Sequence, residues 1–343
     1  MKSYHVNKGA GLASLIVKEH DIPVPGLHDV LVRIRANSLN YRELMILRGT
    51  YPLPVKPDVI PLCDGAGEIV AVGSDVTRAR RGDRVLVNSF PLWIDGPFGG
   101  WKEHGAQIGG SLDGLLTEYV AVNEEWIVPI PEHLSFEEAA ALPCAALTAW
   151  QALTTGKPVQ AGETVLTLGS GGVSLFTLQF AKLSGARVIV TTSSNEKAQR
   201  LKALGADDVI NYRERPDWHE AVQELTGGRG ADHVIETGGP GTLAQSIQST
   251  AVAGQVTLIG FLANAVSTQA QGAIDFNTFI GGLLTVRSIL CGNRAQFQTM
   301  NQFITQHQLK PVIDRVFPFE EARDAYLYYE ETQPLGKVII SQS

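Results

Sequence analysis

The chain has 343 residues, of which 44% are hydrophobic and 18% charged, and its formal net charge is -7 at pH 7. This composition is typical of a globular protein rather than a disordered or fibrous one, and the length favours two domains. The negative charge gives no basis for binding nucleic acid or an anionic membrane, and no apolar run is long enough to span a bilayer.

The first third of the chain is predicted to be rich in β-strands. Runs that alternate apolar and polar residues favour strands over residues 30–35, 65–72, 83–88 and 116–122. Six prolines between residues 23 and 61 favour short strands and loops over helices in that region. Residues 89–114 are rich in Gly, Pro and Trp without a clear period, which is typical of a long surface loop that borders a ligand cleft.

The pattern changes at Ser135, where helices begin to appear. Helices are predicted over 136–142 and 148–154, and Ser135 with Glu138 forms a capping box at the first of them. Strands then alternate with helices, which indicates an open, mostly parallel sheet wound on both faces. The predicted strands cover 165–168, 188–191, 208–212, 233–236, 256–259 and 283–290. The tail, with helices over 295–305 and 319–331 and a strand over 337–340, is expected to fold back onto the first domain.

A glycine turn after the first of these strands is the most informative motif. A diphosphate binds well where a buried strand leads through a glycine turn into a helix. The first turn of the helix offers unpaired N–H groups, and the glycines let the backbone come close to the phosphate oxygens. The third glycine of the pattern G-x-G-x-x-G is Ser174 here, which is small enough for helix–strand packing. We expect a dinucleotide to contact Gly169, Ser170, Gly171, Gly172 and Val173.

The end of the next strand favours NADP over NAD. Sites selective for NAD place Asp or Glu there to bind the ribose hydroxyls, whereas this chain has Thr192, Ser193 and Ser194, followed by Lys197 and Arg200. Hydroxyl groups and cations suit a 2′-phosphate. In the alternative interpretation Ser194 caps the next helix and Lys197 lies on a solvated face.

Several motifs together resemble one enzyme family over essentially the whole chain. A β-rich first domain precedes LPCAALTAW at 142–150, GSGGV at 169–173, LGADDVINY at 204–212 and GKVII at 336–340. The order of these segments resembles that of the medium-chain dehydrogenase/reductase superfamily. Within this superfamily, the chain resembles the zinc-free quinone-oxidoreductase and enoyl-reductase branch more than it resembles the zinc alcohol dehydrogenases. The resemblance implies an α/β fold with a doubly wound parallel-sheet (Rossmann) domain over 129–292. It also implies a β-rich, GroES-like catalytic domain over 1–128 and 293–343, with the active site in the cleft between the domains.

The resemblance also implies roles for individual residues toward the cofactor. Lys197 and Tyr212 match residues that hold the 2′-phosphate, and Thr148 matches a threonine near the nicotinamide. Gly260 matches a glycine that contacts the nicotinamide, with Phe261 after it, and Lys337 matches a basic residue near the pyrophosphate. Asn293 and Arg294 match a segment that lines the cofactor. Tyr41 and Arg42, which follow Asn40, are assigned to the cofactor phosphates or the substrate.

Whether the protein binds a catalytic zinc ion depends on the residues at the positions that bind zinc in the zinc-containing relatives. Where those members have Cys, then Gly-His-Glu, then a later Cys, this chain has Asn40, then Leu62-Cys63-Asp64, then Cys144. A neutral amide in place of the first cysteine removes a strong ligand. We therefore expect no functional zinc and regard both cysteines as ordinary buried residues, although their ligand character leaves accidental metal binding open.

Without a metal, hydrogen-bond donors must stabilise the charge that builds up on the substrate oxygen after hydride transfer. Asn40 can donate from its amide, and Tyr51 in RGTYP matches the residue proposed as proton donor in enoyl reductases. The alternative for Tyr51 is a structural role beside prolines. Asp64 either orients one of these two residues or caps a turn. An enone, enal or quinone is the better substrate, because an isolated alcohol usually needs a metal or a strong base.

These inferences lead to an NADPH-dependent oxidoreductase that reduces a small electrophilic molecule. Two alternatives stay open: an alcohol dehydrogenase with an altered zinc site, and a catalytically silent NADPH-binding sensor. The resemblance implies a homodimer formed through the strand at 283–290. Three widely spaced cysteines among apolar or small neighbours, with no targeting signal, indicate a cytoplasmic protein.

Overall fold

The computed structural model describes residues 1–260 and 276–342, and the chain divides into two compact units. Unit 1 comprises Met1–Leu147 and Cys291–Ser343, and unit 2 comprises Thr148–Leu290. The first boundary lies later than the predicted residue 128, because helix α3 (Phe136–Ala140) packs on strands of unit 1. Phe261 lies outside the described residues.

Unit 1 is built on a mainly antiparallel sheet. Its strand order is β14-β15-β3-β4-β5-β7, with β6 paired to β3, and a separate ribbon pairs β1 with β2. The strands are β1 (Lys2–His5), β2 (Ile16–Glu19), β3 (Asp29–Ser38), β4 (Asp64–Val72), β5 (Arg84–Val87), β6 (Tyr119–Asn123), β7 (Ile127–Pro129), β14 (Ile313–Pro318) and β15 (Lys337–Ser341). The helices are α1 (Tyr41–Leu47), α2 (Trp101–His104), α3, a π-helix (Leu142–Ala146), α10 (Arg294–His307) and α11 (Ala322–Thr332).

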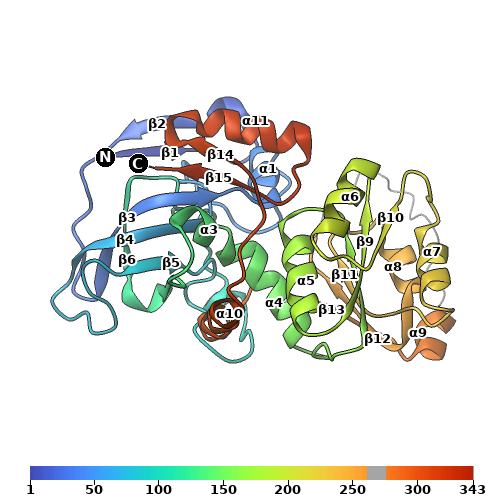
Figure 1. Ribbon diagram of the computed structural model, residues 1–343. Coiled ribbons are helices and arrows are strands. Elements are labelled where there is room, and N and C mark those ends of the chain that lie inside the picture. Colours follow the sequence, from blue (N-terminus) through green and yellow to red (C-terminus); the bar gives the residue numbers. More distant parts are fainter. Residues whose placement is uncertain (261–275, 343) are drawn as a thin grey trace. The chain divides into compact units, whose positions relative to one another are not determined.

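The C-terminal tail folds back onto unit 1, as the sequence predicts. Strand β15 pairs antiparallel with β3 through Ile339↔Ser38 and Ile340↔Asn37, and Figure 1 shows this red strand beside the blue one. The capping box is also confirmed, because Ser135 Oγ accepts from Glu138 N and the Glu138 carboxylate accepts from Ser135 N. The tail therefore completes the sheet that holds the N-terminal half of the chain.

Helix α1 is the main element of unit 1 that the sequence analysis missed. The prolines around it indicated loops and strands, yet residues 41–47 contain none and place Leu44, Ile46 and Leu47 in a buried cluster. Burial of this apolar face overrides the local composition. The helix begins directly after Asn40, so it positions one of the predicted site residues.

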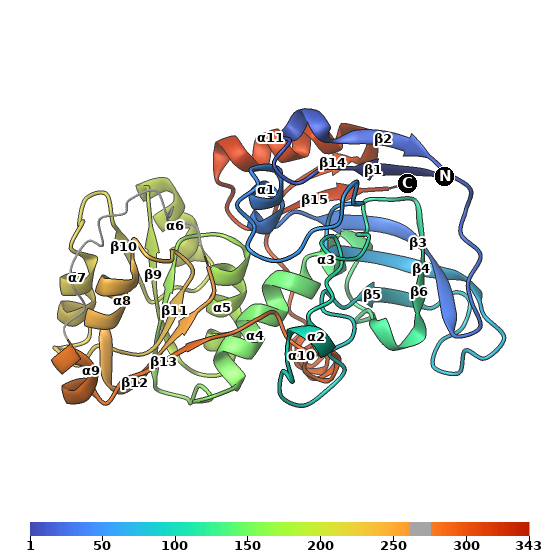
Figure 2. The same cartoon turned by 180° about the vertical axis from the view of Figure 1, so that it is seen from behind.

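Unit 2 contains the predicted parallel sheet, in the order β10-β9-β8-β11-β12-β13. Its strands are β8 (Thr164–Leu168), β9 (Arg187–Thr192), β10 (Asp208–Asn211), β11 (Ala231–Glu236), β12 (Thr250–Leu258) and β13 (Thr285–Ser288). The helices are α4 (Leu147–Thr154), α5 (Gly172–Leu183), α6 (Asn195–Ala203), α7 (Trp218–Leu225), α8 (Leu243–Gln248) and α9 (Phe276–Gly282), and Figure 2 shows α5 to α9 against the strands. Asp217 stands at the N-cap of α7 but its side chain makes no capping hydrogen bond, because its backbone is not extended.

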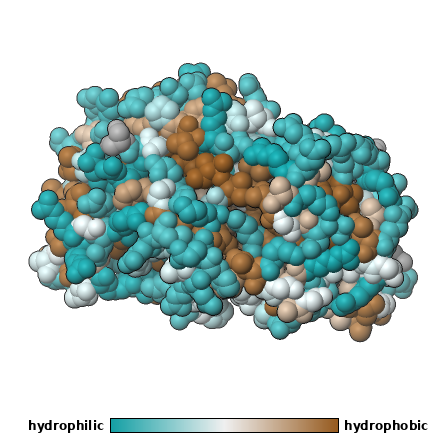
Figure 3. Space-filling model, in the orientation of Figure 1, coloured by the Kyte–Doolittle hydropathy of each residue, from teal (hydrophilic) through white to brown (hydrophobic). Residues whose placement is uncertain are grey.

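The central strands of unit 2 are buried because helices pack around the sheet. Leu166, Ile189, Val234 and Val256 are all fully buried, which explains why these strands read as continuous apolar runs rather than alternating ones. Hydrophilic residues cover much of the surface drawn in Figure 3. In the described part of the chain, no helix combines the length and apolar character that a membrane span requires.

Candidate active site

Asn40 lies between the end of β3 and the start of α1. It occupies the N-cap position with an extended backbone, but its side chain does not cap the helix. Instead its Nδ2 donates to Asp64 Oδ2 at 2.8 Å, and its Oδ1 accepts from Lys337 Nζ at 2.6 Å. The structure therefore brings together Asn40 and Asp64, two of the three residues predicted to be catalytic.

Lys337 completes this buried polar group. Asp64 is the first residue of β4 and is fully buried, and Lys337 is the first residue of β15 and is 3% exposed. The ammonium donates to Leu39 O at 2.8 Å and lies 3.4 Å from Asp64 Oδ2. Burial raises the pKa of Asp64, and the Lys337 charge and the Asn40 hydrogen bond oppose that rise. The pyrophosphate contact assigned to Lys337 stays a prediction, because here its protons are directed at protein oxygens.

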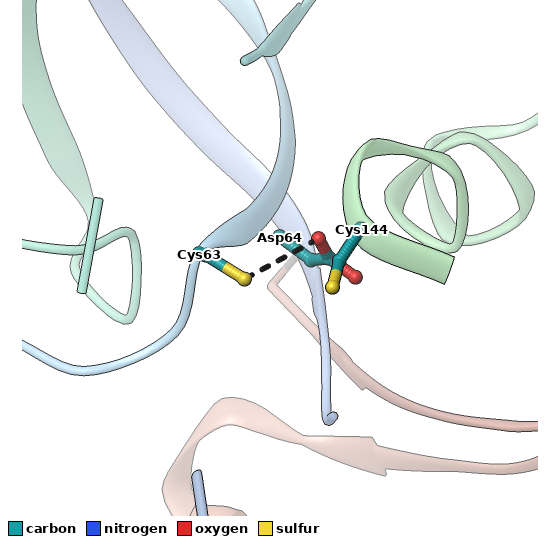
Figure 4. A group of neighbouring side chains, drawn as sticks. All are labelled: Cys63, Asp64 and Cys144. Carbon is teal, nitrogen blue, oxygen red and sulfur yellow. Dashed lines mark hydrogen bonds between the residues drawn. The ribbon is translucent and has the colours of Figure 1, made fainter. Parts of the chain in front are cut away.

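Two cysteines adjoin this group, and Figure 4 shows their sulfur atoms directed toward Asp64. Cys63 Sγ lies 3.7 Å from Asn40 Nδ2 and donates to Asp64 Oδ1 at 3.7 Å. Cys144, from the π-helix, brings its sulfur within 4.8 Å of the ligand atoms of Cys63 and Asp64. Interaction with Cys144 and burial hold the pKa of the Cys63 thiol well above its usual range, so this thiol is neutral near pH 7.

The backbone just before Cys63 is unusual. Leu62 has a φ of 70° although it is fully buried and is not glycine. Such a conformation costs about 1–3 kcal/mol and persists only where the surrounding structure enforces it, most often at functional sites. It sets the direction in which the chain enters β4 and thus where Cys63 and Asp64 point.

Tyr51 lies in a second hydrogen-bonded group with Arg42 and Gln107. The Tyr51 hydroxyl donates to Gln107 Oε1 at 2.5 Å, and Arg42 Nη2 donates to the same oxygen at 3.2 Å. The Arg42 guanidinium also lies over the Tyr51 ring, 5.1 Å from its centroid. Burial raises the pKa of Tyr51 to about 12, although the nearby charge of Arg42 acts to lower it. The Tyr51 hydroxyl therefore keeps its proton at neutral pH.

Arg42, Gln107 and Glu43 are site residues that the sequence did not identify with these roles. Arg42 fixes the loop that carries Gln107, by donating to Ile108 O at 3.0 Å and Gly109 O at 3.1 Å. Gln107 is 2% exposed, and its Nε2 has no hydrogen-bond partner among the described residues. Glu43 is 1% exposed beside Arg42, and burial raises its pKa. No motif marks Gln107 in the 89–114 loop, so only the folded chain could reveal it.

In unit 2 the glycine turn has the form expected of a phosphate cradle. Gly169 follows β8 with a φ of 78°, Gly171 is the N-cap of α5, and a Cβ at either position would meet no atom within 4 Å. Ser174 replaces the third glycine and donates from Oγ to Leu168 O at 2.6 Å, which ties the helix to the strand end. The open backbone at the helix start fits a diphosphate.

The end of β9 carries hydroxyl groups and no carboxylate, as predicted. Thr192 is 1% exposed, and its Oγ1 has no hydrogen-bond partner within the described ranges. Tyr212 follows β10 and donates its backbone N–H to Thr192 O at 2.9 Å, so the two lie side by side. Ser194 Oγ accepts from Lys197 N at 3.2 Å, which confirms that Ser194 caps α6. Ser193 precedes that cap.

The remaining predicted cofactor residues are dispersed over both units. Gly260 follows β12, where a Cβ would overlap the carbonyl of Thr237, and Thr148 is buried at the start of unit 2. In unit 1, Asn293 caps α10 and donates to Gly96 O at 3.1 Å, and Arg294 pairs with Glu125. Tyr41 lies beside Arg48, whose guanidinium is 6.0 Å from its ring centroid. These contacts are structural, and the cofactor roles stay predictions.

Comparison with known proteins places this geometry in a family. Residues 26–132 match the model of the alcohol dehydrogenase GroES-like domain, and residues 172–306 match that of the zinc-binding dehydrogenases. A protein of Schizosaccharomyces pombe named as zinc-type alcohol dehydrogenase-like is 42% identical over 96% of both chains. The chain belongs to the medium-chain dehydrogenase/reductase superfamily. A 2-methylene-furan-3-one reductase of Solanum lycopersicum, 31% identical over 96% of this chain and 76% of its own, is a further relative.

Solved structures of the superfamily share the whole fold. A crystal structure assigned to the alcohol dehydrogenases, from Sinorhizobium meliloti 1021, has a TM-score of 0.90 and 39% identity, and the match covers 99% of this chain and 98% of that one. Other relatives are named as alcohol dehydrogenase, NADPH-dependent alkenal/one oxidoreductase and quinone oxidoreductase. This superfamily member is therefore an NAD(P)H-dependent oxidoreductase with a Rossmann-like sheet and a GroES-like domain.

The zinc ion that many superfamily members carry can be tested against the residues present. Cys63, Asp64 and Cys144 match the number and kind of protein ligands at a catalytic zinc. Their charge environment does not match, because the Lys337 ammonium already pairs with Asp64 at 3.4 Å and with Asn40. A dication there would face an ammonium ion at close range, with little water to screen the repulsion. As arranged, the cluster does not fit a resident zinc ion.

Proposed function

We propose that this protein is an NADPH-dependent reductase of activated carbon–carbon double bonds or quinones that works without a metal ion. The observation that carries the proposal is the Lys337 ammonium, which donates to Asn40 Oδ1 at 2.6 Å and lies 3.4 Å from Asp64 Oδ2. This is where zinc-containing relatives would use the charge of the metal. The name of the Solanum lycopersicum relative, a reductase of a 2-methylene ketone, supports the same substrate class.

The residues of unit 1 have the donors that such a reduction requires. When bound, NADPH supplies a hydride to an electrophilic carbon. The Asn40 amide is held by Asp64 and Lys337, and its second N–H faces Cys63 Sγ at 3.7 Å. That N–H would exchange this weak contact for the substrate oxygen on which charge accumulates. Tyr51 holds a proton at its hydroxyl oxygen, and Gln107 fixes the direction of that O–H. Tyr51 is therefore the proposed proton donor, and Gln107 and Arg42 are positioning residues.

The preference for NADPH rests on the end of β9. The Thr192 hydroxyl has no hydrogen-bond partner among the described residues, Tyr212 lies beside Thr192, and Lys197 follows on α6. A 2′-phosphate would gain hydrogen bonds there, whereas the ribose hydroxyls of NAD would find no acidic partner. A cytoplasmic location belongs to the same proposal, which the absence of a disulfide between Cys63, Cys144 and Cys291 in the described part of the chain supports.

The experiment that tests this function is NADPH and NADH oxidation with a panel of enones, enals, quinones and aldehydes, with and without a chelator. We expect chelator-insensitive turnover of enones or quinones with a preference for NADPH. Tyr51→Phe is expected to lower kcat by about 10²–10⁴-fold. Tyr328→Phe on α11 is the matched control, because the Tyr328 hydroxyl donates to Asp314 on β14 and belongs to neither polar group.

Three results would contradict the proposal. Activity lost to the chelator, or confined to alcohols and aldehydes, would assign Cys63, Asp64 and Cys144 to a metal and favour the alcohol dehydrogenase alternative. Tight NADPH binding with no turnover of any electrophile would favour a sensor. Full activity in Tyr51→Phe would remove Tyr51 from the chemistry while leaving the rest of the proposal standing.

We also infer a homodimer formed along β13. Among the described residues this strand is the last in the order of its sheet. Exposed apolar side chains precede it in the chain, at Phe276 and Ile280 on α9 and at Leu283 directly after that helix. An unpaired edge flanked by apolar residues is a common site for a second copy to extend a sheet. Light scattering on the purified protein is expected to give twice the chain mass, and a value for the single chain would refute the dimer.

A further inference from the structure

The ribbon of β1 and β2 carries a cluster of polar side chains that the proposed reaction does not use. Ser3 and His5 lie two residues apart on β1, so they point to the same face of the ribbon. His20 follows β2, and its backbone N–H donates to Met1 O, which continues the pairing of the two strands. The cluster shares no residue with the candidate active site.

The two imidazole rings face each other through their Nε2 atoms. His5 Nε2 and His20 Nε2 are 3.1 Å apart, and Ser3 Oγ lies 3.0 Å from the first and 2.6 Å from the second. A carbonyl oxygen can only accept, so the 2.9 Å contact of His5 Nδ1 with Asp58 O places the proton of neutral His5 on Nδ1. The lone pair of His5 Nε2 therefore lies on the side of the ring that faces Ser3 Oγ and His20 Nε2.

This arrangement has the dimensions of a metal chelate. A divalent d-block ion binds imidazole nitrogen at about 2.0–2.1 Å, which places two adjacent ligand nitrogens roughly 2.9–3.4 Å apart. Metal-binding histidines usually donate their other ring N–H to a carbonyl or carboxylate, and His5 does so to Asp58. The Lys18 ammonium nearby is paired with the Asp58 carboxylate at 2.6 Å, so it is neutralised rather than directed at the imidazoles.

One side of the cluster is buried in the protein, and the other side is exposed to solvent. Ser3 is fully buried and His5 is 6% exposed, whereas His20 is exposed. An ion could reach the nitrogens from solvent past His20. We propose that His5 Nε2 and His20 Nε2 bind a borderline divalent ion such as Zn²⁺ or Co²⁺, with Ser3 Oγ and water as the oxygen ligands.

The test is a titration of the chelator-treated full-length protein with Co²⁺, followed by calorimetry and absorption. We expect one ion per chain bound through nitrogen and oxygen, without a sulfur-to-cobalt charge-transfer band. His20→Ala is expected to weaken binding by at least about tenfold. His28→Ala is the matched control, because His28 is an exposed histidine of the same unit that lies near Asp75 and Glu124.

Two further measurements keep the result interpretable. Because His20 is exposed, His20→Ala is expected to fold, and an unchanged Tm without metal would verify this. Co²⁺ is expected to raise the Tm of the wild type and of His28→Ala, but not that of His20→Ala. Equal binding by His20→Ala would overturn the proposal, as would a charge-transfer band that Cys144→Ser abolishes with all binding. Absence of binding in the wild type would mean that the cluster is only a chain of hydrogen bonds.

Discussion

Individual residues of the candidate site differ in how far the sequence could predict them. Asn40, Tyr51 and Asp64 stand in recognisable motifs, and the structure gives each a polar partner. The pairing of Lys337 with Asp64 joins residues that are 273 positions apart, so no local pattern could indicate it. Gln107 lies in a loop without a motif, and no local pattern indicates that Arg42, which is predicted to face the cofactor phosphates or the substrate, binds Gln107. Motifs thus identify site residues that lie within one segment of the sequence. Site residues that meet only through tertiary contacts are identified only in the folded structure.

The buried pair of Asp64 and Lys337 leads to a stability prediction. Lys337→Met leaves a buried carboxylate without its cation, and we expect the free energy of unfolding to fall by about 3–5 kcal/mol. Denaturant unfolding would measure this. Lys310→Met is the control, because Lys310 forms an exposed pair with Glu138 and should change stability by no more than about 1 kcal/mol.

A double variant separates charge from packing in this pair. Lys337→Met combined with Asp64→Asn removes both charges and should recover much of the loss. If the double variant is as unstable as Lys337→Met alone, the ammonium acts mainly through packing. The pair would then contribute little electrostatic stabilisation.

At the scale of elements, periodic segments were predicted well and irregular ones poorly. The strand, glycine turn and helix of the nucleotide motif are confirmed, as are the capping box before α3 and the return of the tail to unit 1. Helix α1 and strand β14 were missed. Helix α1 is only seven residues long, too short to show a clear helical period, and it is stabilised by burial rather than by propensity.

Two glycines of unit 2 are expected to respond differently to the same substitution. Gly171 has an ordinary extended backbone and open space around it, so Gly171→Ala should leave the Tm unchanged. It should still weaken NADPH binding by about tenfold or more, or about 1.4 kcal/mol, because the methyl group enters the proposed phosphate cradle. Fluorescence titration with NADPH would measure the loss.

Gly260→Ala is the contrasting variant. Its Cβ would overlap the carbonyl of Thr237, so the backbone at the end of β12 must shift and the Tm should fall. If Gly171→Ala bound NADPH as tightly as the wild type, the diphosphate could not lie against this turn. A lower Tm in Gly171→Ala would instead show that the turn is more tightly packed than the structure indicates.

At the scale of the whole molecule, a fully buried histidine in unit 2 links the stability of the protein to pH. His233 Nε2 on β11 donates to Glu163 Oε2 at 2.8 Å, and burial lowers the pKa of His233 below 6.5. Burial also raises the pKa of Glu163, but the hydrogen bond with His233 and neighbouring groups outweigh it, and the net pKa is lowered. Both groups therefore bind fewer protons in the folded protein than in the unfolded chain.

These two shifts predict acid sensitivity. Since the unfolded state binds more protons, stability is lost as the pH falls below about 6.5 for His233 and then below the ordinary range of Glu163, by at most about 1.4 kcal/mol per pH unit for each proton. We expect the Tm to decrease between pH 7.5 and pH 5.5, with a smaller decrease in His233→Gln. His28→Gln, which changes an exposed histidine, should follow the wild type. Equal slopes in all three proteins would exclude His233 as the cause.

The order of the two units along the chain affects how the protein is made. Residues 148–290 form unit 2 as one continuous stretch, whereas β14 and β15 of unit 1 are synthesised only after that stretch is complete. Until then the nascent chain displays the end of β3, at Ala36, Asn37 and Ser38, without its β15 partner and Asp64 without its ammonium, while unit 2 can already fold at the ribosome. The interval between the two events is when this chain is most exposed to strand-edge association and has the greatest need of chaperones.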